Sequence, residues 1–121
     1  MLATIFFTAV QTSSASATMR NLAIHNHTGY NITSLWLYPE SDPTWGNGST
    51  DVLRALGYSS LDNGNYVTMS YNDSHTYWKL RIVLANGNQA TWTGGSKLDL
   101  SGAWKITIFR RSNGHFSVSK N

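Results

Sequence analysis

Few side chains in this sequence could carry chemistry, and their spacing restricts the reactions open to them. The chain holds four histidines and no cysteine, so thiol catalysis is excluded. His25 and His27 are two residues apart, a spacing that places both side chains on one face of a strand and could begin a zinc site. No third ligand follows at a fixed spacing. We therefore predict no metal and no cofactor, and expect these histidines to be solvated or to cap turns.

Paired carboxylates are the other route to catalysis, and they are confined to one segment. Glu40, Asp42 and Asp51 lie in the irregular stretch 39–57, where two of them at catalytic separation would suit a glycoside hydrolase. Residues 62–65 favour a hairpin turn over a calcium loop, because the terminal glutamate of such a loop is missing. No G-x-S-x-G nucleophile motif is present. We predict a protein that is not an enzyme, and keep a small glycan hydrolase as the third hypothesis.

Charge is distributed unevenly along the chain. Before Thr76 there are two basic and five acidic residues, whereas from Thr76 onward there are seven basic residues and one acidic residue. Lys79, Arg81 and Lys105 fall at outward positions of two predicted strands, and we expect them to form one basic face. Such a face fits an anionic partner: a lipid head group, an acidic glycan or an acidic protein. A solvated face that only keeps the protein soluble is the alternative.

The segment 39–57 is a second candidate contact surface, because it is the longest stretch without strand periodicity. Trp45 stands among glycines there, as either a lid over one end of the core or an exposed anchor for a ligand. We expect one helical turn over 51–56, with Val52, Leu53 and Leu56 plugging one end of the core. The predicted ligand-binding residues are Trp45, Lys79, Arg81 and Lys105.

The first seventeen residues differ from the rest of the chain. Residues 2–10 are apolar, 11–16 are small and polar, and 15–17 match an A-x-A cleavage pattern. The apolar run is about nine residues, too short to cross the roughly 30 Å hydrocarbon core as a helix. We predict a signal peptide over 1–17, a single domain over 18–121, a secreted or periplasmic location, and no transmembrane segment. A buried N-terminal strand is the alternative.

Apolar residues recur at every second position in several segments, which is the period of a half-buried strand. The predicted inward residues are Trp78, Leu80, Ile82 and Leu84 in 76–84, Trp104, Ile106 and Ile108 in 103–110, and Val67, Met69 and Tyr71 in 66–71. We expect the first two sets to meet at the centre of the core on neighbouring strands. The mixed register of 30–38 predicts a bulge near Ser34.

Turn-forming pairs separate these segments at regular intervals. Asn86-Gly87 and Asn113-Gly114 suit a positive φ and predict hairpins. Seven or eight short strands without a long helical period predict an all-β protein, an antiparallel β-sandwich preceded by the signal peptide. Because the chain has no cysteine, the core and the ladder hydrogen bonds must supply its stability.

Four short motifs are spread over 21–108: an N-x-T-G turn at 26–29, Trp45-Gly46, an L-x-x-G turn at 61–64, and Leu80-Arg81 in a strand. Together they resemble a family of small exported bacterial β-sandwich proteins of unknown function. Lys79 stands where the strand motif of that family has an acidic residue. The resemblance implies the fold and export, and no particular chemistry. Residues 71–81 and 112–120 are similar to actinoporin-like lytic sandwiches, although the predicted mature domain has no amphipathic N-terminal helix of the kind such pores use.

These features favour a non-enzymatic binding or interaction module that uses the basic face or the segment 39–57. A membrane-active, actinoporin-like sandwich is the alternative, and leakage of liposomes distinguishes the two. Nucleic acid is not an expected partner, because export separates the protein from it and no recognition motif is present. The sequence leaves the ligand and the oligomeric state open.

Overall fold

The computed structural model describes residues 19–41, 50–72, 75–92 and 98–121. The predicted signal peptide, Asp42 and Trp45 lie outside the described residues. Among the helices of the described ranges, none has the length and apolar character needed to cross a membrane.

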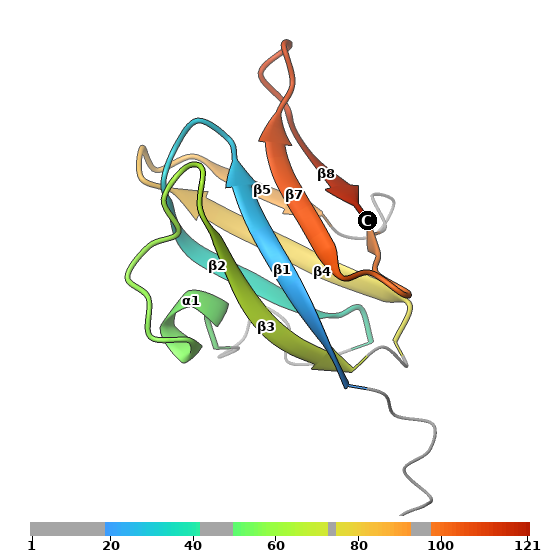
Figure 1. The fold of residues 1–121 in the computed structure, drawn as a ribbon. Helices are drawn as coiled ribbons and strands as arrows, with labels where there is room; N and C mark the ends of the chain where they lie inside the picture. The colour runs from blue at the N-terminus through green and yellow to red at the C-terminus, as the bar shows by residue number, and fades with distance from the viewer. Residues whose placement is uncertain (1–18, 42–49, 73–74, 93–97) are drawn as a thin grey trace, which may run out of the picture.

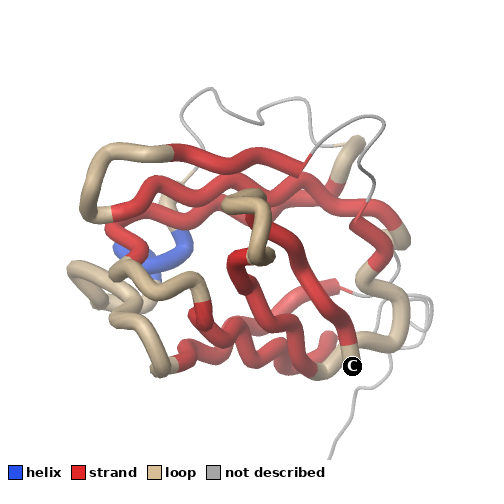
Figure 2. The backbone as a smooth tube through the Cα atoms, turned by 90° about the horizontal axis from the view of Figure 1, so that it is seen from above, coloured by secondary structure: helices blue, strands red, loops and turns tan. Residues whose placement is uncertain are grey.

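The described residues form eight strands and one short helix, arranged in two sheets (Figure 1). The elements are β1 (Met19–His27), β2 (Ile32–Pro39), α1 (Val52–Ala55), β3 (Tyr66–Asn72), β4 (Tyr77–Leu84), β5 (Gln89–Trp92), β6 (Leu98–Asp99), β7 (Lys105–Arg110) and β8 (Phe116–Lys120). The front sheet has the order β3-β1-β7-β8, and the back sheet has the order β2-β4-β5, with β6 also paired to β4. Figure 2 shows the strands in two layers. The predicted all-β architecture is confirmed.

Strands β1 and β7 are parallel neighbours, so the prediction of a purely antiparallel sandwich is wrong at this point. Ala23 lies beside Lys105 and His25 beside Thr107 in this pair. The other strand pairs are antiparallel. Turn residues predict only those pairs that a hairpin joins, whereas the back sheet lies between β1 and β7 in the sequence.

Alternate residues of both sheets point into one apolar core. The apolar side chains with 0% exposure on β1, β4 and β7 are Leu22, Ile24, Leu80, Ile82, Ile106 and Ile108. Trp78 is 4% exposed, which confirms the predicted inward register of β4. Because β4 and β7 belong to opposite sheets, their apolar side chains meet across the core, which corrects the expectation that they lie on neighbouring strands.

Trp104 departs most clearly from the predicted register, because 61% of it is exposed. The Asn121 N–H donates to the Lys105 oxygen (2.9 Å), while the Asn121 oxygen accepts from the Trp104 N–H (3.0 Å). Two residues thus stand opposite one, as in a β-bulge, and both lie between the buried Ala103 and Ile106. The inward position expected for Trp104 is therefore taken by Ala103, and β7 begins at Lys105.

The predicted bulge in β2 is present, as a register shift between Ile32 and Ser34. The predicted helical turn is also present, and Asp51 begins it, because its Oδ1 accepts from the Leu53 N–H (2.9 Å). Val52 and Leu53 are buried as expected. Leu56 is 38% exposed, so its predicted place in the core is wrong: α1 ends at Ala55, and Leu56 is the cap that follows.

A buried amide fixes the turn after β1. Asn26 is 0% exposed, and its Nδ2 donates to the oxygens of Tyr30 (2.7 Å) and Leu61 (2.8 Å). Its Oδ1 accepts from the N–H and the hydroxyl of Thr28 (3.0 and 2.7 Å). The whole amide is satisfied, which allows a polar group in the core. Leu61 also forms a bridge with Ile32, the first residue of β2. The amide therefore joins the end of β1, the start of β2 and the segment around Leu61.

Candidate functional site

The three predicted basic residues that the structure describes do not share one face. Lys79 and Arg81 alternate with buried residues on β4, so they point outward from the back sheet. Lys105 alternates with buried residues on β7 and points outward from the front sheet. The single basic face expected from the sequence is therefore divided between opposite surfaces of the molecule. Alternation indicates on which side of its own sheet a residue lies, and it carries no information on which sheet the strand joins.

On the back sheet, Arg81 is held by its neighbours. Its Cζ lies 4.8 Å from the centroid of the Trp36 ring, and its Nε and Nη2 donate to Gln89 Oε1 (3.3 and 2.8 Å). The guanidinium thus ties β2, β4 and β5 together. The Trp36 ring covers one face of the guanidinium, and Gln89 accepts from two of its donors. These contacts give Arg81 a structural role. Lys79 lies opposite Tyr38 on the same surface.

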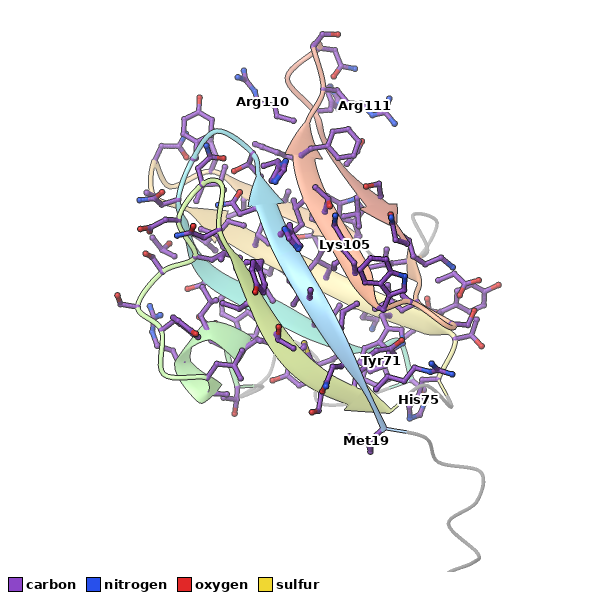
Figure 3. The ribbon with its side chains drawn as sticks, viewed as in Figure 1. Met19, Tyr71, His75, Lys105, Arg110 and Arg111 are labelled. Atoms are coloured by element: carbon purple, nitrogen blue, oxygen red, sulfur yellow. The ribbon has the colours of Figure 1, made fainter. Side chains whose placement is uncertain are left out.

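The outer surface of the front sheet carries more functional groups. Half-buried or exposed rings share this surface with Lys105, and we call the set the aromatic–cationic face: His25, His27, Tyr66, Trp104, Lys105 and Phe109. The His25 ring stacks on Tyr66, with centroids 4.8 Å apart and planes 16° apart. It meets His27 edge-on at 6.2 Å. Figure 3 shows Lys105 on this sheet.

Ladder register explains why these side chains come together. His25 lies opposite Tyr66 on β3 and beside Thr107 on β7, and His27 lies beside Phe109. The face therefore depends on the parallel β1–β7 pair, which no turn signal predicts. The outward positions of the predicted strands already contain Tyr66 and Phe109, and this signal was present in the sequence. Trp104 reaches the surface only through the bulge-type pairing with Asn121.

The aromatic–cationic face is electropositive. The four strands of the front sheet contain no Asp or Glu. Partial desolvation lowers the pKa of His25 from its ordinary value, and the Lys105 ammonium and the His27 ring lower this pKa further. At neutral pH the His25 imidazole is thus uncharged, with one nitrogen that donates and one that accepts hydrogen bonds.

Two arginines lie at the end of the β7–β8 hairpin, where Figure 3 labels them: Arg111 beside Phe109 of the aromatic–cationic face, and Arg110 at an inward position of β7. The Arg111 Cζ lies 5.9 Å from the centroid of the Phe109 ring, and its Nε donates to Ser117 Oγ (2.5 Å). The Arg110 Cζ lies 5.9 Å from the centroid of the Tyr30 ring. Both arginines remain exposed, so they keep donors for an anionic ligand.

The structure gives the other chemical candidates no catalytic arrangement among the residues it describes. No group of three or more His, Asp or Glu side chains lies close enough to hold a metal ion in these ranges. Asp51 accepts from the N–H groups of Leu53 and Leu35 (2.9 and 3.1 Å), so it caps α1 and anchors β2. Glu40 lines a cavity of about 320 Å³ with His75 and Tyr77, and no second carboxylate is among the described residues of that lining.

Comparisons with known proteins bear on the fold alone. No family model matches the sequence, and no curated protein matches it significantly. The NMR structure of a protein from Eubacterium rectale is similar, with a TM-score of 0.58 over 92% of this chain and 94% of that chain. The two proteins share a fold. Their sequence identity is 11%, so the likeness says nothing about the activity of either chain.

Proposed function

We propose that the protein is an exported, non-enzymatic binding module that holds an acidic glycan on its aromatic–cationic face. The observation that supports this most directly is the combination of exposed rings and cations on one outer sheet surface whose strands hold no carboxylate. Tyr66 and Trp104 are 59% and 61% exposed. Exposing several rings of this size to water is unfavourable in free energy. Exposed patches of this kind are typical of ligand-binding surfaces.

Each group of the face has a role that suits a sugar acid. The flat ring of Tyr66 or Trp104 can pack against the C–H face of a pyranose, because an aromatic ring offers apolar area at a low entropic cost. The Lys105 ammonium would pair with a carboxylate or sulfate of the ligand. The uncharged His25 imidazole would exchange hydrogen bonds with sugar hydroxyls. A ligand with both rings and charges uses all of these groups together.

The chain provides a matched control, because Lys79 and Lys105 are both half-buried lysines at outward strand positions on opposite surfaces. Lys105→Glu and Lys79→Glu change the net charge equally. For sulfated and carboxylated glycans at about 0.1 M salt, where the Debye length is about 10 Å, we expect Lys105→Glu to raise Kd at least about tenfold. Lys79→Glu should stay within about twofold. Both variants should unfold within about 1 kcal/mol of the natural protein.

Equal weakening by the two reversals would refute the proposed face, since it would indicate attraction by net charge alone. Glycan binding that does not weaken as salt rises would refute the acidic ligand. Vesicles that contain anionic phospholipid form the second arm of the experiment. Binding to them without binding to glycans would assign a lipid head group instead, and leakage of trapped dye would favour an actinoporin-like lytic function.

A further inference from the structure

A groove with a volume of about 510 Å³ lies between β5 and the start of β8. These two strands are the last in the back and front sheets, as Figure 1 shows. One wall is the whole of β5 together with Asn88. The other wall is formed by Gly114, His115 and Phe116 at the start of β8. The volume falls within the roughly 300–1,000 Å³ that is usual for ligand sites. This groove is on another side of the molecule from the aromatic–cationic face, which lies on the outer surface of the front sheet.

The backbone of β5 offers unpaired hydrogen-bonding groups to this groove. The Leu84 N–H donates to the Asn88 oxygen (2.8 Å), which sets the phase of the β4–β5 ladder. In an antiparallel ladder every second residue bonds to the neighbouring strand. Ala90 and Trp92 therefore bond to β4, whereas the N–H and C=O groups of Gln89 and Thr91 point away from β4 and into the groove. Within the described part of the chain, no backbone group pairs with them.

The side chains of this edge are also incompletely covered. Ala90, Trp92 and Phe116 are at inward positions and pack against the core, yet all three are only partly buried. Strand β5 contains no charged residue and no proline, the features that usually protect a free edge from pairing with another chain. The edge therefore combines free ladder groups with apolar side chains that a further strand would bury.

Charges beside the groove decide between a second copy of this chain and a different partner. His115 lines the groove, and Arg110 Nη2 lies 3.8 Å from the position that a Cβ on Gly114 would occupy. A second copy would bring the same arginine and its own net charge of +3 to the interface. Like charges oppose that pairing, whereas a segment with Asp or Glu would be attracted.

We propose that the free edge of β5 accepts an extended segment of a partner protein as an added strand, with apolar residues at alternate positions and an acidic residue near His115 and Arg110. The N–H and C=O groups of Gln89 and Thr91 form the ladder with this segment. Its apolar side chains cover Ala90, Trp92 and Phe116. This surface is independent of the glycan site, so the protein can hold a glycan and a protein partner together.

Thr91 allows a specific test, because its N–H faces the free edge and a proline there removes one donor without breaking a bond to β4. The probe is a nine-residue peptide of alternating Val and Thr with Asp at both ends, and its affinity is measured by titration calorimetry. We expect Thr91→Pro to weaken binding about tenfold. Thr91→Val is the matched control, since it keeps the N–H and should bind the peptide as the natural protein does. In the natural protein, the peptide should slow amide hydrogen exchange at Gln89 and Thr91.

A second variant keeps the test decisive if Thr91→Pro does not fold. His115→Glu is an exposed change, and it should weaken binding of the acidic peptide while strengthening binding of a version that ends in Lys. Absence of binding by the acidic peptide, or equal binding to Thr91→Pro and Thr91→Val, would overturn the proposal. A dimer in sedimentation experiments that Thr91→Pro returns to a monomer would overturn the choice of partner and assign the edge to a second copy.

Discussion

Replacement of Trp104 by alanine tests both the bulge-type pairing and the exposure of this side chain. A tryptophan buries at most about 250 Å², which corresponds to about 6 kcal/mol at about 25 cal/mol per Å². Because 61% of Trp104 is exposed, less than half of that contact exists to be lost. The extended chain overestimates burial, so we expect Trp104→Ala to lower the free energy of unfolding by about 1–2 kcal/mol.

Trp78→Ala is the comparison, because Trp78 is 4% exposed, lies edge-on to Tyr71 at 5.5 Å, and donates to the His75 oxygen (3.1 Å). Its loss leaves a cavity and should cost about 3–5 kcal/mol. Urea unfolding followed by circular dichroism measures both variants, since the fluorescence signal itself changes with each tryptophan. If the two variants lose equal stability, Trp104 lies in the core and the proposed pairing with Asn121 is wrong.

Three further predictions concern local features. Asn26→Leu should lower the free energy of unfolding by about 2–4 kcal/mol in urea, because it leaves buried partners of the amide unsatisfied, and a loss below about 1 kcal/mol would contradict the network. Folding lowers the pKa of His25. As pH falls through about 6.5, the folded protein therefore binds fewer protons than the unfolded protein. Stability should thus decrease with falling pH in that interval, and His25→Asn should reduce the dependence of the free energy of unfolding on pH, measured by urea unfolding between about pH 5 and 8. Gly87 has φ 89°, so Gly87→Ala should cost about 1 kcal/mol or more in thermal unfolding and Gly87→Asn less.

Local features of the fold followed from neighbouring residues. The period of two in β3 and β4 predicted that Val67, Tyr71 and Trp78 lie inward, and all three are buried. Gly87 and Gly114 predicted the β4–β5 and β7–β8 hairpins. Their turns need a positive φ, which glycine adopts at little cost in free energy. The bulge in β2 was visible as a change of register within a few residues. In each case the cause lies within one strand or one turn.

The candidate site was only partly visible in the sequence. The spacing of His25 and His27 predicted that both lie on one face of a strand, and the alternation around Lys105 predicted that this lysine faces outward; the structure confirms both predictions. The approach of Lys105 to these histidines depends on β1 lying parallel to β7. The error at Trp104 has a similar origin, because the C-terminal Asn121 pairs with two residues and shifts the register at the start of β7. Strict alternation cannot anticipate an extra residue opposite a distant chain end.

By itself, the sequence determined which segments are strands, where they turn, and which side of each strand is apolar. These properties depend on backbone sterics and on the period of a pleated chain, which act over a few residues. Only the tertiary structure decided that Lys79 and Lys105 lie on opposite surfaces and that β5 is the last strand of its sheet within the described ranges. The assignment of a strand to a sheet depends on how the chain crosses between layers to bury all apolar faces at once, and no short segment contains that information.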